Sequence, residues 1–201
     1  MSTPTRKLFG TDGVRGEAGR FPLDRSTLRT VGASLASHLA KNSKSSPLII
    51  VGRDTRESGP WLEEALIDGA IEAGAQCQSA GVITTPGVAF LARSLPADAG
   101  VVISASHNPY QDNGIKIFAP SGRKLDDETE RLIEADILAK QSLAPLDVPV
   151  THWQETSSQA ETSASALQAR YLEFLEQDIG AGLSLANYSL VIDAANGAAV
   201  Q

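Results

Sequence analysis

The sequence predicts an α/β protein, with a three-layer α/β/α domain around a mixed, mainly parallel sheet and then the start of a second, similar domain. Short apolar runs alternate with segments of helical periodicity between residues 26 and 140, which is the pattern of successive βαβ units. The chain has 201 residues, which at roughly 150 residues per domain is more than one such domain and less than two.

The first elements of the predicted domain are a helix, a strand and a second helix. Residues 26–41 repeat apolar side chains at helical spacing. Residues 47–55 are a short apolar run that ends in glycine and charged residues, as expected for a buried strand that opens into a loop. Ser58 is expected to cap a helix over residues 59–74, which Gly74 closes.

The remaining elements continue the alternation. The strand at 115–119 alternates apolar and polar residues, which indicates a mixed sheet rather than an all-parallel one. Pro86 suits the first turn of a short helix, and Asp126 and Asp127 suit the start of a longer one. In order, the expected elements are a weak strand (77–81), a short helix (84–95), a buried strand (99–106), a loop (106–114), the strand at 115–119 and a helix (128–140).

The composition changes after about residue 141, and this change sets the predicted domain limits. We expect residues 1–150 to form one complete domain. Seven of the sixteen residues in 151–166 are serine or threonine without apolar period, so we expect a surface linker over 151–165. Residues 166–201, read as a helix at 166–180 and a strand with a turn at 187–201, are expected to be the incomplete start of a second domain.

The charge and the cysteine count narrow the classes of protein. A net charge of −7 argues against a nucleic-acid or anionic-membrane partner, which calls for a basic surface. A single cysteine, Cys77, forms neither an internal disulfide nor a cysteine-based metal site. The sequence contains neither a long apolar run nor an apolar signal core, so a cytosolic location is expected. The charge and composition do not decide between a monomer and a homodimer.

Three polar loops carry the candidate functional residues. They are Phe9–Gly16, Gly52–Arg56 and Ser104–Gly114, and the last two follow strands, where sites form in open α/β sheets. Their side chains suit a phosphorylated small molecule. The candidates are Ser104, Ser106, His107, Asn108, Arg15, Arg53, Arg56 and Lys116.

Ser106 is the best candidate nucleophile, because it follows a buried strand directly and Pro109 keeps the loop from continuing as a helix. An ordinary loop serine that caps the backbone fits the same pattern. His107 is a candidate base, but the G-x-S-x-G turn of a serine hydrolase is absent. A hydrolase that uses Ser106 and His107 predicts labelling by a fluorophosphonate, which we do not expect.

The cationic candidates each have a structural alternative. Lys116 is expected to point away from the core that Ile115 and Ile117 face, either over the loop or simply into solvent. Arg53, Asp54 and Arg56 also fit a structural salt-bridge cluster, and Asp12, Gly13 and Gly16 could simply build turns. Arg15 lies between two glycines, which let a backbone approach an anion closely.

Three motifs of this chain, taken together, resemble those of a known enzyme family. FGTDGVRG (9–16), GRDTRESG (52–59) and ISASHNPYQDNGIKIF (103–118) occur in this order, and the chain from about Lys7 to Gly197 resembles the α-D-phosphohexomutase superfamily. Ser104 and Ala105, together with the first motif, favour its phosphoglucosamine mutase branch over phosphomannomutase/phosphoglucomutase.

The resemblance implies a phosphoenzyme. Phosphorylated Ser106 would exchange its phosphoryl group with a hexosamine phosphate through a bisphosphate intermediate. The implied reaction would interconvert glucosamine 6-phosphate and glucosamine 1-phosphate for UDP-N-acetylglucosamine synthesis. Lys116 and Arg15 would stabilise the transferring group, and Lys116 would also shuttle a proton. His107, a further catalytic residue, would orient the loop or the sugar oxygens, while Asn108 and Arg53 would bind substrate. A Mg²⁺ ion would bind Ser106 through its phosphate.

The family's other motifs are missing from these residues. The D-G-D-G-D-R metal loop, the G-E-x-S-G sugar loop and the R-x-S-G-T-E-P phosphate loop do not occur. We therefore expect the chain to be part of a longer mutase and to be inactive alone. A phosphosugar-binding module without catalysis is the alternative from another class.

Overall fold

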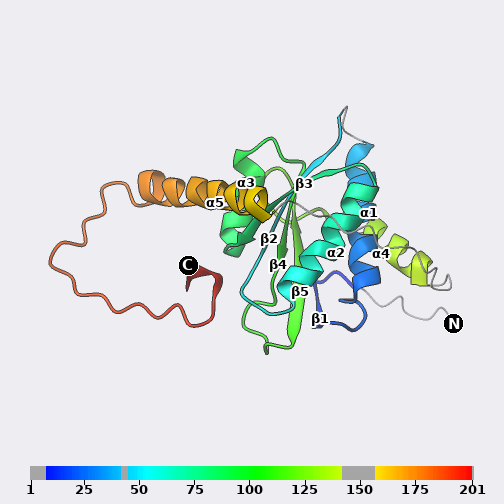
Figure 1. The fold of residues 1–201 in the computed structure, drawn as a ribbon, viewed down its shortest axis with the longest axis horizontal. Helices are drawn as coiled ribbons and strands as arrows, with labels where there is room; N and C mark the ends of the chain where they lie inside the picture. The colour runs from blue at the N-terminus through cyan, green and yellow to red at the C-terminus, as the bar shows by residue number, and fades with distance from the viewer. Residues whose placement is uncertain (1–7, 42–44, 142–156, 201) are drawn as a thin grey trace.

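The computed structural model describes residues 8–41, 45–141 and 157–200, and a five-stranded sheet forms its centre (Figure 1). The strand order is β1-β5-β4-β2-β3. β2 is parallel to β3 and β4, whereas β5 is antiparallel to β4 and to β1, so that four of the five strands run in the same direction. The strands are β1 (Val14–Glu17), β2 (Leu48–Arg53), β3 (Gln76–Val82), β4 (Ala99–Ile103) and β5 (Asp112–Phe118).

Helices cover both faces of the sheet (Figure 1). Ile49 and Val51 of β2 are buried in the cluster that includes α1 (Arg25–Ala40), α2 (Gly59–Glu72) and α4 (Asp127–Gln141). Ile50, the residue between them, is buried on the other face with α3 (Thr85–Ser94) and α5 (Ser157–Phe174). Burying such a side chain contributes about 2 kcal/mol. The α/β/α layers and the mixed, mainly parallel sheet are confirmed.

The N-terminal ends of α1 and α2 differ in their capping. Asp24 caps α1, because its carboxylate accepts a hydrogen bond from the Thr27 N–H. The prediction that Ser58 caps α2 is wrong: its side chain makes no capping bond. The Ser58 hydroxyl instead accepts a hydrogen bond from Asn113 Nδ2 at 2.8 Å. Gly74, with φ +90°, follows the end of α2 as predicted.

α1 and α2 pack with unusually close backbones. A Cβ at Gly32 would lie 2.0 Å from the Leu66 carbonyl oxygen, and a Cβ at Gly69 would lie 2.0 Å from that of Arg29. Only glycine allows this approach. Arg29 also joins α1 to α2, because its guanidinium lies 2.9 Å from the buried carboxylate of Asp68.

α4 binds the backbone of the first described residues, Leu8 and Phe9. Asp126 caps the helix through the Thr129 N–H at 2.9 Å. Two turns further on, Glu134 Oε1 accepts hydrogen bonds from the N–H groups of Leu8 at 2.7 Å and Phe9 at 2.5 Å. The segment that leads into β1 is therefore anchored to α4.

α5 begins at Ser157, inside the segment predicted as a linker. The helix packs against the edge strand β3, where the Gln168 side chain donates to the carbonyl oxygens of Ala80 and Val82. Its far end packs on α3, because the rings of Phe90 and Phe174 stack with centroids 4.3 Å apart. α5 therefore completes the helical layer on this face.

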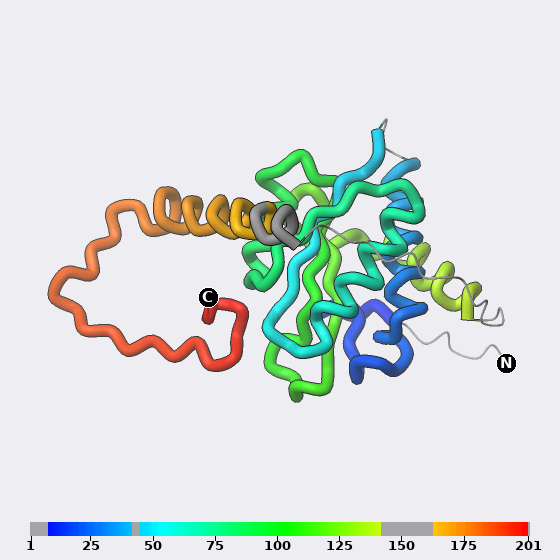
Figure 2. The backbone as a smooth tube through the Cα atoms, viewed as in Figure 1, coloured from blue at the N-terminus to red at the C-terminus, as the bar shows by residue number. Residues whose placement is uncertain are grey.

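The strand expected at 187–201 is not formed. Residues 187–197 contain turns and extended chain without strand pairing, and Val191 and Ile192 are exposed. A strand needs a partner for its backbone groups, and no described residue supplies one. Figure 2 shows the tail, residues 180–200, leaving the C-terminal end of α5 and returning to the rest of the molecule.

The predicted domain limits stay predictions, and residues 142–156 lie outside the described ones. Within the described ranges, no helix is long and apolar enough to cross a membrane.

Candidate functional site

The loop between β4 and β5 presents Ser106 at the surface. The Ser104 N–H donates to the Gly114 carbonyl at 2.9 Å, which closes the base of the loop. Ser106 is exposed with φ +58°, a left-handed conformation that costs a non-glycine residue free energy and depends on surrounding contacts. One such contact is the Ser104 hydroxyl, which accepts from the Ser106 N–H at 3.0 Å.

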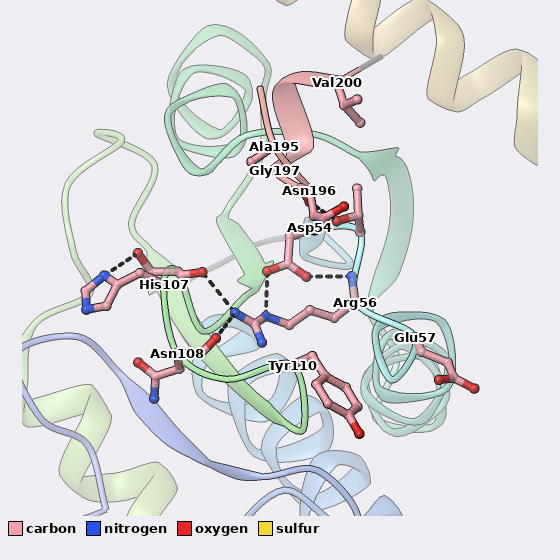
Figure 3. A pocket seen from close by; sticks show the side chains of 12 residues that line it. Asp54, Arg56, Glu57, His107, Asn108, Tyr110, Ala195, Asn196, Gly197 and Val200 are labelled. Carbon is pink, nitrogen blue, oxygen red and sulfur yellow. Dashed lines mark hydrogen bonds and ion pairs between the residues drawn. The ribbon is translucent and has the colours of Figure 1, made fainter. Parts of the chain in front are cut away.

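Arg56, which follows β2, holds this loop through its guanidinium group, and Figure 3 shows its contacts with Asp54 and Asn108. Its Nη2 donates to the carbonyl oxygens of Ser106 and Asn108, each at 2.9 Å. Its Nη1 donates to those of Pro109 at 2.6 Å and Asp112 at 3.0 Å. Its Nε donates to Asp54 at 3.0 Å. All five N–H donors of the guanidinium are thus used.

These contacts give Arg56 a role that the sequence did not reveal. The ion pair with Asp54 matches the structural cluster considered for this segment. The four carbonyl contacts join the end of β2 to a loop about fifty positions further along the chain. Nothing in the local sequence of Arg56 indicates such a tertiary partner.

Arg15 reaches the same loop from the sheet edge. Its Nη1 lies 3.1 Å from Asn108 Oδ1 and 3.3 Å from the Ala105 carbonyl oxygen. Arg15 is paired in register with Gly114 of β5, and a Cβ at Gly114 would lie 3.1 Å from the Arg15 Cγ. The missing side chain at Gly114 therefore leaves room for Arg15 to pass toward the loop.

Lys116 points away from the core, as predicted: Ile115 and Ile117 are buried on either side of it. Its Nζ contacts Asp12 Oδ1 at 3.2 Å. The hydrogen bond and charge of Lys116, together with the charges of Arg15 and His107, hold the pKa of Asp12 below its ordinary value. Asp12, read from sequence as a turn residue, is therefore part of a cluster with the two cations.

His107 Nδ1 lies 3.4 Å from Ser106 Oγ, a long contact between neighbouring residues. Over residues 8–41, 45–141 and 157–200, no carboxylate hydrogen-bonds to the His107 ring. This part of the chain therefore does not assemble a Ser–His–Asp triad, which removes support for the hydrolase alternative.

Arg53 is the predicted site residue that the structure does not bring to the loop. Its Nε donates to Glu63 Oε2 on α2 at 2.8 Å. Glu63 also accepts a hydrogen bond from the Ser79 hydroxyl of β3 at 2.6 Å. Arg53 thus belongs to a contact that links β2, α2 and β3.

A cleft of about 750 Å³ opens beside Ser106 (Figure 3). One wall comes from the segment after β2, a second from the Ser106 loop and a third from the turn at 195–197 of the tail. The tail is tied to this place by the Thr55 hydroxyl, which donates to the Asn196 carbonyl. The lining residues are Asp54, Thr55, Arg56, Glu57, Ser106, His107, Asn108, Tyr110, Ala195, Asn196, Gly197 and Val200.

The described residues do not bring together a set of metal ligands: no three histidine, cysteine or acidic side chains among them form a cluster. Three of the acidic groups near the loop have partners of their own. Asp12 pairs with Lys116, Asp54 with Arg56, and Asp112 accepts from the Asn108 amide at 2.9 Å. The set therefore does not fit a complete Mg²⁺ site of oxygen ligands.

Comparison with known proteins places these features in a family. A family model described as "Phosphoglucomutase/phosphomannomutase, alpha/beta/alpha domain I" matches residues 6–144. Two curated relatives are the phosphoglucosamine mutases of Koribacter versatilis, 40% identical over 99% of this chain, and Syntrophobacter fumaroxidans, 45% identical over 95%. The chain spans 42% and 41% of their respective lengths.

Solved structures agree with the fold. A putative phosphomannomutase from Thermus thermophilus superposes on 68% of this chain with a TM-score of 0.59 and 33% identity, covering 30% of that structure. A phosphoglucomutase/phosphomannomutase family protein from Burkholderia thailandensis superposes on 67% with a TM-score of 0.58 and 28% identity, covering 30% of that structure.

Proposed function

The chain belongs to the phosphoglucomutase/phosphomannomutase family, and from this we propose that it is the N-terminal part of a phosphoglucosamine mutase. The observation that carries the proposal is the exposed Ser106 on a loop held by Arg56 and Arg15. Two phosphoglucosamine mutases match 95% or more of the chain at 40% and 45% identity, which supports the choice of branch.

In the proposed reaction, phosphorylated Ser106 donates its phosphoryl group to a hydroxyl of the hexosamine phosphate. The bond between phosphorus and Ser106 Oγ breaks, a bond from phosphorus to the sugar oxygen forms, and the sugar's hydroxyl proton ends on Ser106 Oγ. The resulting bisphosphate then returns its other phosphoryl group to Ser106 by the reverse steps. Glucosamine 6-phosphate thereby becomes glucosamine 1-phosphate, for UDP-N-acetylglucosamine synthesis.

The neighbouring side chains have roles in this reaction that follow from their charge and position. Catalysis of phosphoryl transfer depends mainly on positioning and on stabilising negative charge, so Arg15 and Lys116 are our candidates for that stabilisation. His107, 3.4 Å from Ser106 Oγ, is the candidate for carrying the transferred proton. Asn108 is the candidate for binding the sugar's oxygen atoms. The ion pair of Arg53 with Glu63 supports a structural role in place of substrate binding.

The proposal includes Mg²⁺ only to the extent that phosphorylated Ser106 would supply one oxygen ligand. Because the described residues lack a ligand cluster, the other ligands would come from the longer protein. We therefore expect these residues alone to be inactive.

The proposal also specifies the substrate, because it names glucosamine phosphates rather than other hexose phosphates. The T. thermophilus structure is named a putative phosphomannomutase, so a mutase for mannose or glucose phosphates is the second candidate. The test is to assay the full-length enzyme with glucosamine, glucose and mannose 6-phosphates, each in the presence of its bisphosphate. Phosphoglucosamine mutase predicts the highest kcat/KM for the amino sugar, and preference for mannose or glucose would favour the alternative. Sugar phosphate binding without turnover would indicate a non-catalytic module.

A further inference from the structure

Asp12 lies between the two cations that the proposed function assigns to the phosphoryl group. Its Oδ1 is 3.2 Å from Lys116 Nζ, and its Oδ2 is 3.9 Å from Arg15 Nη2. An anion that already belongs to the protein therefore engages the positive charge beside Ser106.

Arg15 retains capacity to bind a second anion. Its Nη1 makes two hydrogen bonds of 3.1 and 3.3 Å to Asn108 and Ala105. Its Nη2 lies 3.9 Å from Asp12, beyond hydrogen-bond distance, and its buried Nε has no hydrogen-bond partner among the described residues. The guanidinium is therefore not saturated by protein acceptors. Arg56 differs, because every donor of its guanidinium is used.

The Asp12 side chain can leave these cations without a change in the backbone. The side chain is 62% exposed. Its turn is closed by reciprocal hydrogen bonds between Gly10 and Gly13 at 2.9 and 3.2 Å. The preceding residues Leu8 and Phe9 are anchored to Glu134. Rotation of the side chain alone would turn the carboxylate into solvent.

We propose that Asp12 is an internal counter-anion: it engages Lys116 and Arg15 while Ser106 is unphosphorylated, and a phosphoryl group on Ser106 displaces it. The proposal rests on the proposed function of Ser106. A phosphoserine carries a charge of roughly −1.5 to −2 at neutral pH, so it attracts both cations more strongly than a carboxylate and repels the carboxylate itself. Asp12 thus keeps the cations paired in the unphosphorylated loop and competes with free anions for them.

The first experiment measures competition in this chain of 201 residues, with inorganic phosphate as the probe followed by NMR. The Asp12→Asn variant should bind phosphate roughly tenfold more tightly than wild type at low salt, because a unit charge beside the cations is removed. The gain should shrink as salt is added. The matched control is Asp127→Asn, which removes an exposed carboxylate that pairs with Lys124 and should leave phosphate affinity unchanged. Equal or weaker binding by Asp12→Asn, or no measurable binding by either protein, would overturn the proposal.

The second experiment separates this proposal from the proposed function. Phosphoserine is built into position 106 during synthesis, so the result does not depend on whether the enzyme phosphorylates itself. Carboxyl NMR should show that the lowered pKa of Asp12 returns to or above its ordinary value when position 106 carries the phosphoryl group. An unchanged Asp12 titration would refute displacement even if Ser106 proves to be the phosphorylated residue. Displacement here, combined with no phosphate on Ser106 in the natural enzyme, would instead refute the proposed function alone.

Discussion

The guanidinium of Arg56 donates a hydrogen bond of 2.9 Å to the carbonyl oxygen of Ser106, and its other donors reach three further carbonyls of the same loop and Asp54. The side chain is largely buried. The residue with the left-handed backbone, Ser106, is therefore fixed by a side chain from the segment that follows β2. Lysine cannot replace this arrangement, since an ammonium group lacks the planar array of five donors.

We predict that Arg56→Lys loosens the Ser106 loop without unfolding the domain. Hydrogen exchange at the amides of residues 106–112 should become faster, while amides of β2 and β4 stay protected. In the full-length enzyme kcat should fall by about 10²-fold, since small displacements of a reacting group are costly. Arg20→Lys, at an exposed ion pair with Glu17, is the control. Unchanged exchange and kcat in Arg56→Lys would show that the loop holds its shape without these contacts.

Glu134 should stabilise the protein by accepting the two N–H groups of Leu8 and Phe9. Glu134→Ala leaves both donors without their acceptor, so we expect the free energy of unfolding to fall by about 2 kcal/mol. Glu134→Gln retains an acceptor oxygen and should lose less. Urea denaturation measures the difference, with Glu128→Ala on the exposed side of α4 as the control. If Glu134→Ala and Glu128→Ala are equally stable, the anchor contributes nothing.

The cap of α4 should make part of the stability depend on pH. The hydrogen bond from the Thr129 backbone N–H is the largest of the causes that hold the pKa of Asp126 below its ordinary value. This stabilisation is present above the unfolded-state pKa and is lost as the pH falls through the lowered folded-state pKa. Asparagine also caps helices but does not titrate.

Between about pH 5 and pH 2, the free energy of unfolding should therefore fall less in Asp126→Asn than in wild type. The difference should be about 0.5 kcal/mol, because this carboxylate is exposed and screened by solvent. Denaturation at each pH measures this difference. Asp178→Asn, at an exposed position outside any cap, should retain the wild-type dependence. Identical pH profiles for Asp126→Asn and wild type would contradict the role of the carboxylate.

Cys77 should be unreactive in the folded protein. Burial raises the pKa of its thiol to about 12, and only the thiolate attacks alkylating reagents. At about pH 8, alkylation should be on the order of 10³-fold slower in the native chain than in denaturant, where the thiol has its ordinary pKa. The unfolded chain serves as its own control, and comparable native and unfolded rates would contradict the raised pKa of this partly buried thiol.

The elements that the sequence predicted well are those whose signal is local and strong. The apolar runs of β2 and β4 and the periodic helices α1 and α2 were expected close to their observed limits. β1 was not expected, because its four residues contain only one large apolar side chain, Val14, and it forms by pairing with β5. The strand expected after residue 187 had apolar residues but lacks a partner among the described ones.

The candidate site shows the same division between local and tertiary signals. Ser106, His107 and Asn108 were predicted because they follow a strand directly, and in the structure all three line the cleft. The contacts of Arg56 and Asp12 join positions distant in sequence and at different strands, so spacing alone does not reveal them. Arg53 had the same local signal as Arg56, and only packing against Glu63 separates the two arginines.

The central claim is that Ser106 carries the transferred phosphoryl group, and mass spectrometry of the full-length enzyme tests it most directly. After incubation with glucosamine 1,6-bisphosphate, intact-mass and peptide analysis should find one added phosphoryl group on Ser106. Subsequent glucosamine 6-phosphate should remove it as bisphosphate forms. Ser106→Ala should lose both the added phosphoryl group and mutase activity, whereas Ser37→Ala, at an exposed helix serine, should retain both. A phosphoryl group on another residue, or substantial turnover by Ser106→Ala, would contradict the account.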